Sequence, residues 1–277
     1  MSVKAAAGAA AEEGPPAERL GRHDPVFLVR VEDAGLNASA PPQQRWMDGW
    51  LVRFNPGKAQ RARCINAVAA GCRRIDEKLA ECATLYRSHG LPMTVRITPF
   101  TQPAELDGVL RQAGFGYHDD TRVMVLPRID RVALDTGPVP AGMTWAEVSA
   151  ADYAEAVGAL RGSSTPVRQA HAERLLASPV PYRGFVLTHG KEVVACGQVA
   201  QEGALVGLYD IATATGQQRQ GRGEWVCKRL LAFAFDEAGA RSAYLQVGAY
   251  NAGARRLYTR LGFEDGYGYH YRLAPGG

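Results

Sequence analysis

The stretch from Leu208 to Leu231, LYDIATATGQQRQGRGEWVCKRLL, constrains this chain of 277 residues more than any other segment. Apolar and β-branched residues predict a strand, a loop with three glycines follows, and a helix begins at once. Glycine lets a backbone turn tightly and approach a ligand closely, and the first helical turn presents unpaired N–H groups at its positive end. Arg219 and Arg222 add charge beside this turn. The segment therefore predicts a site for an anionic diphosphate.

Residue spacing excludes several other kinds of site. The loop has neither the G-x-G-x-x-G spacing of a dinucleotide-binding fold nor the Gly-Lys-Ser/Thr of a P-loop. The five cysteines include no Cys-x-x-Cys pair, and the six histidines include no pair at close helical spacing. We therefore expect no metal site and no disulfide framework, which favours a reducing compartment.

The loop resembles a known family signature. Residues 218–223, QRQGRG, are similar to the Gln/Arg-x-x-Gly-x-Gly/Ala signature of the GNAT superfamily of N-acetyltransferases, although Ala214-Thr215-Gly216 stands where that family usually has a Pro-like or acidic residue. The resemblance implies acetyl-CoA as cosubstrate, with its pyrophosphate held by the loop amides. The residues that it assigns to this cofactor are Gln218, Arg219, Gln220, Gly221, Arg222, Gly223 and Glu224.

A second run, Val247 to Phe263, resembles the strand, Asn-x-x-Ala, Leu-Tyr and Gly-Phe elements of the same superfamily. The resemblance implies that Asn251 contacts the pantetheine arm or caps a helix, and that Tyr258 protonates the leaving thiolate. Both residues also have plain structural interpretations. Asn251 precedes a predicted helix and is a good N-cap residue whatever the function. Tyr258 on its own fits core packing.

The resemblance also implies a reaction, in which an amine attacks the acetyl thioester directly in a ternary complex. We expect the backbone of Ile211, Ala212 and Thr213 to bind the cofactor, with a splay between this strand and Gln246–Gly248 admitting the pantetheine. Asp210 is a candidate general base, and a structural carboxylate is an equal alternative.

The predicted function is therefore acetyl-CoA-dependent N-acetylation of a primary amine of a small molecule. The alternative is a non-catalytic acyl-CoA-binding or interaction module. The sequence does not identify the acceptor, since amino acids, polyamines, aminoglycosides and protein N-termini all stay open. Acyl-chain preference and oligomeric state also stay open.

The order of elements predicts an α/β fold with two GNAT-like domains, each a mixed, mostly antiparallel sheet flanked by helices. Residues 25–128 form the first domain, 129–142 a linker, and 143–277 the catalytic domain, after a disordered tail at 1–24. The stretches 106–126 and 254–273 echo each other as helix, Gly-Phe and strand, which favours duplication. The first domain is predicted to be degenerate, because its corresponding loop, Ala69–Arg73, holds a single glycine.

Within the first domain, Phe27–Val31 and Trp46–Phe54 are each predicted to be one strand, and Arg63–Val68 the hairpin partner of the second. Trp46 and Trp50 fit core packing better than a lining of the cleft. Predicted helices cover residues 74–89, 104–113, 152–161, 171–177, 224–239 and 252–261.

Charge and hydropathy limit the partners. The net charge is +4, and its basic residues are dispersed. The nearest approach to a basic stripe, Arg45, Arg53, Lys58, Arg61 and Arg63, is interpreted as a solvated strand pair, so no nucleic-acid partner is expected. No apolar run reaches the roughly 18 residues of a membrane span, and no targeting signal precedes residue 25, which together favour a cytoplasmic protein without a membrane partner.

Overall fold

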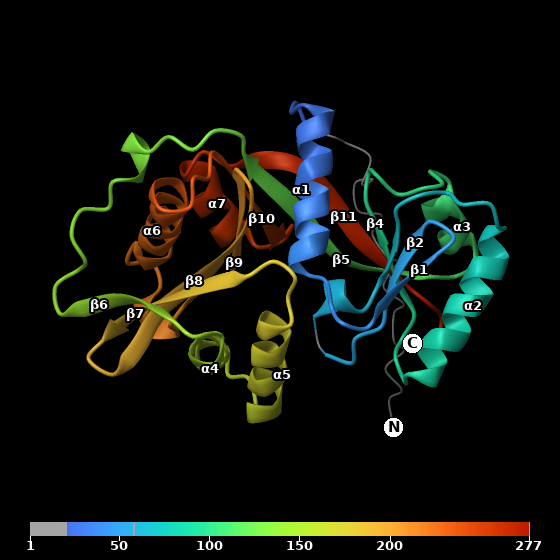
Figure 1. The fold of residues 1–277 in the computed structure, drawn as a ribbon, viewed down its shortest axis with the longest axis horizontal. Coiled ribbons are helices and arrows are strands. Elements are labelled where there is room, and N and C mark those ends of the chain that lie inside the picture. The colour runs from blue at the N-terminus through green and yellow to red at the C-terminus, as the bar shows by residue number, and fades with distance from the viewer. Residues whose placement is uncertain (1–20, 58, 277) are drawn as a thin grey trace, which may run out of the picture.

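The computed structural model describes residues 21–57 and 59–276 as seven helices and eleven strands (Figure 1). The helices are α1 (Pro25–Ala38), α2 (Ile75–Ser88), α3 (Leu106–Gln112), α4 (Ala150–Leu160), α5 (Thr165–Leu176), α6 (Arg222–Asp236) and α7 (Ala252–Arg260). The strands are β1 (Gln44–Met47), β2 (Trp50–Arg53), β3 (Ile65–Ala67), β4 (Thr94–Ile97), β5 (Gly116–Leu126), β6 (Met143–Val148), β7 (Tyr182–His189), β8 (Glu192–Glu202), β9 (Leu205–Thr213), β10 (Ser242–Gly248) and β11 (Glu264–Leu273).

All eleven strands form one sheet, in the order β1-β2-β3-β4-β11-β5-β10-β9-β8-β7-β6. Within the described residues, only the pairs β3–β4 and β9–β10 are parallel, so the predicted mixed, mostly antiparallel sheet is confirmed. The two halves of the chain exchange strands in the middle of this sheet. β5 lies between β10 and β11, and β11 lies between β4 and β5.

This exchange gives the sequence echo a structural counterpart. The units α3–β5 and α7–β11 each run from a short helix into a long strand, and the two strands pair antiparallel with each other. Going outward from them, each side has one antiparallel neighbour and then a parallel pair, β4–β3 on one side and β10–β9 on the other. The arrangement supports duplication, and the domain boundaries stay a prediction.

The core forms on both faces of the sheet, because strand side chains alternate between the faces. Val123 and Val125 of β5 belong to a buried cluster with α1. Met124, between them, belongs to a cluster with α6 on the opposite face. α1 crosses the middle of the sheet, between the two halves of the molecule (Figure 1).

The predicted strand at Phe27–Val31 is wrong, because this segment is part of α1. Asp24 caps the helix by accepting a hydrogen bond from the N–H of Val26 at 3.0 Å, and Pro25 opens it. Its buried face includes Leu28, Val31 and Ala34, which recur at a helical spacing of three residues. The five residues of the predicted strand are too few to show this spacing.

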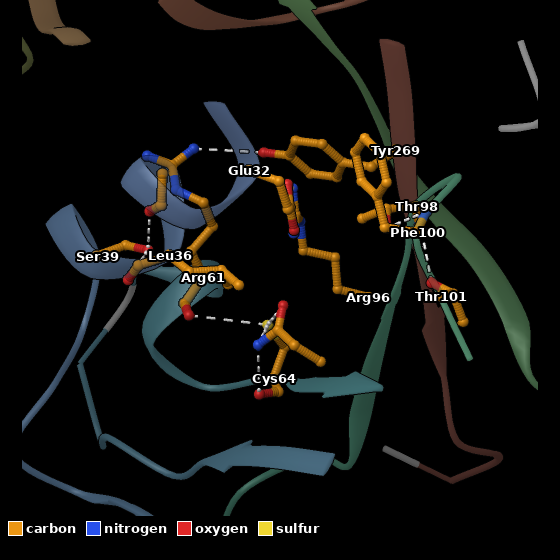
Figure 2. A network of polar contacts seen from close by, with 12 residues as sticks. Glu32, Leu36, Ser39, Arg61, Cys64, Arg96, Thr98, Phe100, Thr101 and Tyr269 are labelled. Carbon is orange, nitrogen blue, oxygen red and sulfur yellow. Dashed lines mark hydrogen bonds and ion pairs between the residues drawn. The ribbon is translucent and has the colours of Figure 1, made fainter. Parts of the chain in front are cut away.

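A buried ion pair fixes α1 to both halves of the sheet. Arg96 of β4 binds the Glu32 carboxylate through both of its terminal nitrogens, with Nη2 to Oε2 at 3.0 Å. The hydroxyl of Tyr267, on β11, donates to the same oxygen at 2.6 Å. Figure 2 shows Glu32 and Arg96 facing each other in this network. Burial opposes ionisation of Glu32, but Arg96 outweighs it and lowers the pKa of this carboxyl.

The predicted single strand at Trp46–Phe54 is also wrong, because β1 and β2 form a hairpin there. Asp48 and Gly49 turn it with φ of +42° and +82°, as a tight two-residue turn requires. β2 does pair antiparallel with β3, as predicted. Trp50 is fully buried, so its predicted core packing is confirmed. Trp46 is 64% exposed, so the same prediction is wrong for Trp46.

Most of the predicted linker at 129–142 is exposed, but two of its residues pack into the core. Ile129 and Leu134 are buried in the cluster that contains α6, and the Ile129 N–H donates to Arg241 O at 2.8 Å. Most of the predicted disordered tail, residues 1–20, lies outside the described residues, as does Lys58. Within the described part of the chain, no helix combines the length and apolar character that a membrane crossing needs.

Candidate active site

The loop between β9 and α6 presents a run of unpaired backbone donors. After a short 3-10 turn at Thr215–Gln217, Arg219 and Gly221 adopt left-handed φ values of +60° and +75°. Gly221 is the N-cap of α6, and no side chain caps that end. Among the described residues, the N–H groups of residues 219–224 have no hydrogen-bond partner. This geometry suits a diphosphate, because several N–H groups and the positive end of α6 are available to one anion.

The loop side chains fall into two groups. Arg219 is exposed and forms no hydrogen bond or ion pair with another described residue, so its charge is available. Arg222 instead folds back, and its Nε donates to Gln217 Oε1 at 2.8 Å. Glu224 accepts from Arg260 at 3.0 Å, which joins α6 to α7. Of the three charged residues assigned to the cofactor, only Arg219 is therefore free to reach a phosphate.

The strands β9 and β10 separate beside this loop. Their parallel pairing runs from Ser242↔Leu205 to Leu245↔Leu208 and then stops, although both strands continue. β9 stays paired with β8 as far as Thr213. The edge of Ile211, Ala212 and Thr213 that faces β10 is thus left without a strand partner. A narrow opening lined by backbone donors and acceptors results, where the sequence predicts a splay.

A β-bulge at the start of this splay redirects Asp210. Between β8 and β9, Tyr209 pairs with Gln198 and Ala212 with Cys196, so β9 carries one extra residue. Asp210 has a left-handed φ of +51° in this bulge. A Cβ on the opposing residue, Gly197, would lie 2.6 Å from Ile211 Cδ1, so glycine makes room for the bulge.

Three side chains hold the Asp210 carboxylate. Arg161 donates to Oδ1 at 2.8 Å, Gln198 donates to Oδ2 at 2.7 Å, and His171 Nε2 lies 3.3 Å from Oδ2. Burial alone would raise the pKa of Asp210, but His171 and Arg161 together lower it well below its usual range. A carboxylate that is so strongly held in its ionised form is a weak proton acceptor. The geometry therefore favours the structural interpretation of Asp210 over that of a general base.

His171 is the residue that sequence reasoning missed. It lies on α5, and the Asp210 bulge meets it from β9. Its Nε2 is buried and forms no well-aligned hydrogen bond to a described residue, and its side chain lines the cavity described below. No spacing in the sequence relates residues 171 and 210, so this pair becomes visible only in the contact that the fold makes between α5 and β9.

Asn251 precedes the first residue of α7 and Tyr258 lies within this helix, and both side chains line one cavity. Asn251 caps α7, and its Oδ1 accepts from the Ala254 N–H at 3.1 Å, so its cap interpretation is confirmed. Tyr258 is half-buried on α7 and packs edge-on against Phe263 at 6.1 Å between ring centroids. Burial raises the pKa of Tyr258 well above its usual value, so the phenol stays protonated and can act as a donor.

One cavity of about 900 Å³ joins these residues. Its lining includes Asp210, Ile211, Asn251 and Tyr258, and it continues to α4, α5 and residues 55–57 and 59–62 of the first half. Both halves of the chain therefore build the site. Among the described residues, no group of three His, Cys, Asp or Glu side chains is placed to hold a metal ion.

In the corresponding loop of the first half, Ala69–Arg73, backbone N–H groups already donate hydrogen bonds to a side chain of the protein. The Asp48 carboxylate accepts from the Cys72 N–H at 2.9 Å and from the Arg73 N–H at 2.9 Å, just before α2 begins. These two backbone bonds lower the pKa of Asp48. A protein carboxylate thus fills the place that a phosphate would need, which supports the prediction of a degenerate first half.

Comparison with known families covers nearly the whole chain. The family model described as "Probable histone acetyltransferase Rv0428c C-terminal" matches residues 28–272. An uncharacterized N-acetyltransferase of Bacillus subtilis, YobR, is 26% identical over 231 residues, which cover 83% of this chain and 92% of YobR.

Solved structures show the same fold. A GCN5-related N-acetyltransferase from Kribbella flavida matches with a TM-score of 0.66 at 19% identity, over 93% of this chain and 98% of that one. A tandem GNAT protein from the clavulanic acid biosynthesis pathway matches with a TM-score of 0.59 at 16% identity, over 74% of this chain and 72% of that one.

Proposed function

Because this chain belongs to the family of the probable histone acetyltransferase Rv0428c C-terminal region, and with it to the GNAT superfamily of N-acetyltransferases, we propose that it transfers an acetyl group from acetyl-CoA to a primary amine of a small molecule. One observation carries the proposal. The unpaired N–H groups of residues 219–224 lie beside a splay that opens into the cavity shared by both halves.

The coenzyme would bind along this path. Its pyrophosphate would take the N–H groups of residues 219–224, with Arg219 adding charge. Its pantetheine arm would lie in the splay, where the free edge of Ile211–Thr213 offers backbone hydrogen bonds. An N–H of that edge would polarise the thioester carbonyl, as preorganised donors do in acyl transfer.

Two side chains would move protons. His171, held by Asp210, takes the proton that the acceptor's ammonium must lose before attack, as a positioned side-chain base does in general acid–base catalysis. The amine nitrogen then forms the new C–N bond to the acetyl carbonyl as the C–S bond breaks, and it loses its second proton to solvent as the amide forms. Tyr258 gives its phenolic proton to the departing thiolate and is reprotonated by solvent.

A thioester-cleavage assay over a panel of amines tests this function. We expect coenzyme A release that depends on amine, together with an equal amount of N-acetylated product detected by mass spectrometry. Binding of acetyl-CoA in a calorimeter without turnover on any amine would instead assign a non-catalytic acyl-CoA-binding module. Repeating the titration with longer acyl-CoAs defines the acyl-chain preference.

A further inference from the structure

Arg61 brings a cation from the first half of the chain into the cavity of the second. It lies in the 3-10 turn Gln60–Ala62, between β2 and β3, and lines the cavity. Its Nη1 donates to Gln246 Oε1 at 2.6 Å and to the hydroxyl of Tyr269 at 3.3 Å. Figure 2 shows the guanidinium reaching toward Tyr269. Gln246 belongs to β10 at the splay, so Arg61 is held next to the proposed path of the thioester.

The other edge of this guanidinium has no partner in the part of the chain that the structure describes. Arg61 Nε is buried without a hydrogen bond, and Nη2 donates to no described residue. No carboxylate of the described residues lies within ion-pair distance of Arg61. Nε and Nη2 form one edge of the planar group, which matches the two oxygens of a carboxylate. A buried cation is costly without an anion, so this edge is suited to a ligand that supplies one. The expectation that Arg61 is a solvated surface residue is therefore wrong.

The rest of the cavity also favours an anion. Arg161 is neutralised by Asp210, and Arg168 by Glu155. Arg174, on α5, lines the same cavity and has no carboxylate partner among the described residues, like Arg61. Among the described residues, the lining holds four arginines and two aspartates, so its field attracts negative groups and repels strongly basic acceptors.

We propose that the acceptor carries a carboxylate as well as its amine, and that the free edge of Arg61 binds that carboxylate. The inference rests on the proposed function and deepens it, because it selects amino acids from the possible acceptors. Polyamines, and a lysine within a basic peptide, lack the anion that this edge requires. The binding would place the acceptor between Arg61 and the splay, with its amine near His171.

Matched pairs of acceptors provide the test. Each pair contains an amino acid and its carboxamide, namely glycine and glycinamide, L-lysine and L-lysinamide, and L-glutamate and its diamide. For the intact chain we expect kcat/KM to be about tenfold or more higher for the acid than for the carboxamide of at least one pair. The carboxamide cannot form the charge-assisted hydrogen bonds with Arg61, and their loss typically has an effect of this size. A thermal-shift titration of the same pairs, with coenzyme A present, measures binding without turnover.

Two variants locate the preference at Arg61. Arg61→Gln removes the charge, and we expect it to raise KM for the acid about tenfold while the carboxamide is affected much less. Gln246→Glu keeps an acceptor for Arg61 Nη1 but neutralises the guanidinium, so it should reduce the same preference with the fold intact. Arg63→Gln is the control, because Arg63 bonds Gln60 and does not line the cavity.

The outcomes separate the two proposals. Turnover with no acid preferred over its carboxamide, by rate or by binding, overturns the carboxylate site and leaves the acetyltransferase proposal standing. If Arg61→Gln and Gln246→Glu leave the acid-to-carboxamide ratio of kcat/KM unchanged, the carboxylate site is likewise overturned and the acetyltransferase proposal still stands. Absence of acetyl-CoA binding overturns the proposed function itself, whatever the acceptors do.

Discussion

At the scale of single residues, Asp210 and His171 have separate tasks in the proposed reaction. The lowered pKa of Asp210 means that its carboxylate stays ionised at neutral pH and loses its charge only as the pH falls below its usual range. We expect His171→Ala to lower kcat by about 10²-fold or more, which is typical for loss of a general base, with little change in KM for acetyl-CoA.

Asp210→Asn distinguishes a positioning role from direct catalysis. The amide keeps hydrogen-bonding capacity but removes the negative charge that holds His171. We therefore expect kcat to be reduced by less than in His171→Ala, and not abolished. Unchanged kcat would contradict the coupling of the two residues, and loss of all activity would restore Asp210 as the base.

Tyr258→Phe tests the proposed acid. The phenol stays protonated over the working range because burial raises its pKa, so it should contribute no limb to the pH profile. We expect kcat to fall by about 10²-fold while acetyl-CoA binding changes little, because the ring packing against Phe263 is kept. A variant with full activity would mean that Tyr258 is only a packing residue.

At the scale of elements, the turn into α6 depends on one left-handed glycine. Gly221→Ala forces a side chain into φ of +75°, which costs about 1–2 kcal/mol and disfavours the arrangement of free N–H groups. The Kd for acetyl-CoA, measured by calorimetry, should rise about tenfold. Gly216→Ala is the matched control in the same loop, because Gly216 has open space around it and no left-handed φ. Equal effects of the two variants would contradict a specific role for the turn.

Local patterns predicted the elements whose burial has a clear period. α2, α6 and α7 lie close to their predicted ranges, because each has a regular apolar stripe and a recognisable beginning or end. The prediction for α1 is wrong, because the helix start is signalled by Asp24 and Pro25, which precede the apolar residues on which the predicted strand depends. The turn at Asp48-Gly49 was missed because the strands on either side are only four residues long.

The candidate site likewise has features that the sequence could predict and features that it could not. The loop conformation and the splay follow from a contiguous motif, so the sequence could indicate them. The contact between His171 and Asp210 joins positions that are 39 residues apart in the sequence. The contact that brings Arg61 into the cavity joins positions that are 185 residues apart, so no local sequence pattern could predict either contact.

At the scale of the whole molecule, the exchanged strands make the halves interdependent. Residues 143–277 alone would lack β5, which fills the space between β10 and β11, and would expose two long strand edges. We expect this fragment to aggregate by size-exclusion chromatography, and co-expression with residues 1–128 to restore a soluble pair. As a control, a protease site inserted at the exposed Gly137 should leave the cut chain folded, because both halves stay present. A soluble, active fragment 143–277 would contradict the interdependence.

The central claim is that acetyl-CoA lies across the α6 turn and into the β9–β10 splay, and a crystal structure of the acetyl-CoA complex tests it most directly. We predict pyrophosphate oxygens within hydrogen-bond distance of the N–H groups of residues 219–224 and the thioester beside Ile211–Thr213. A complex with the coenzyme bound elsewhere, and with this turn and splay closed by protein side chains, would contradict the account.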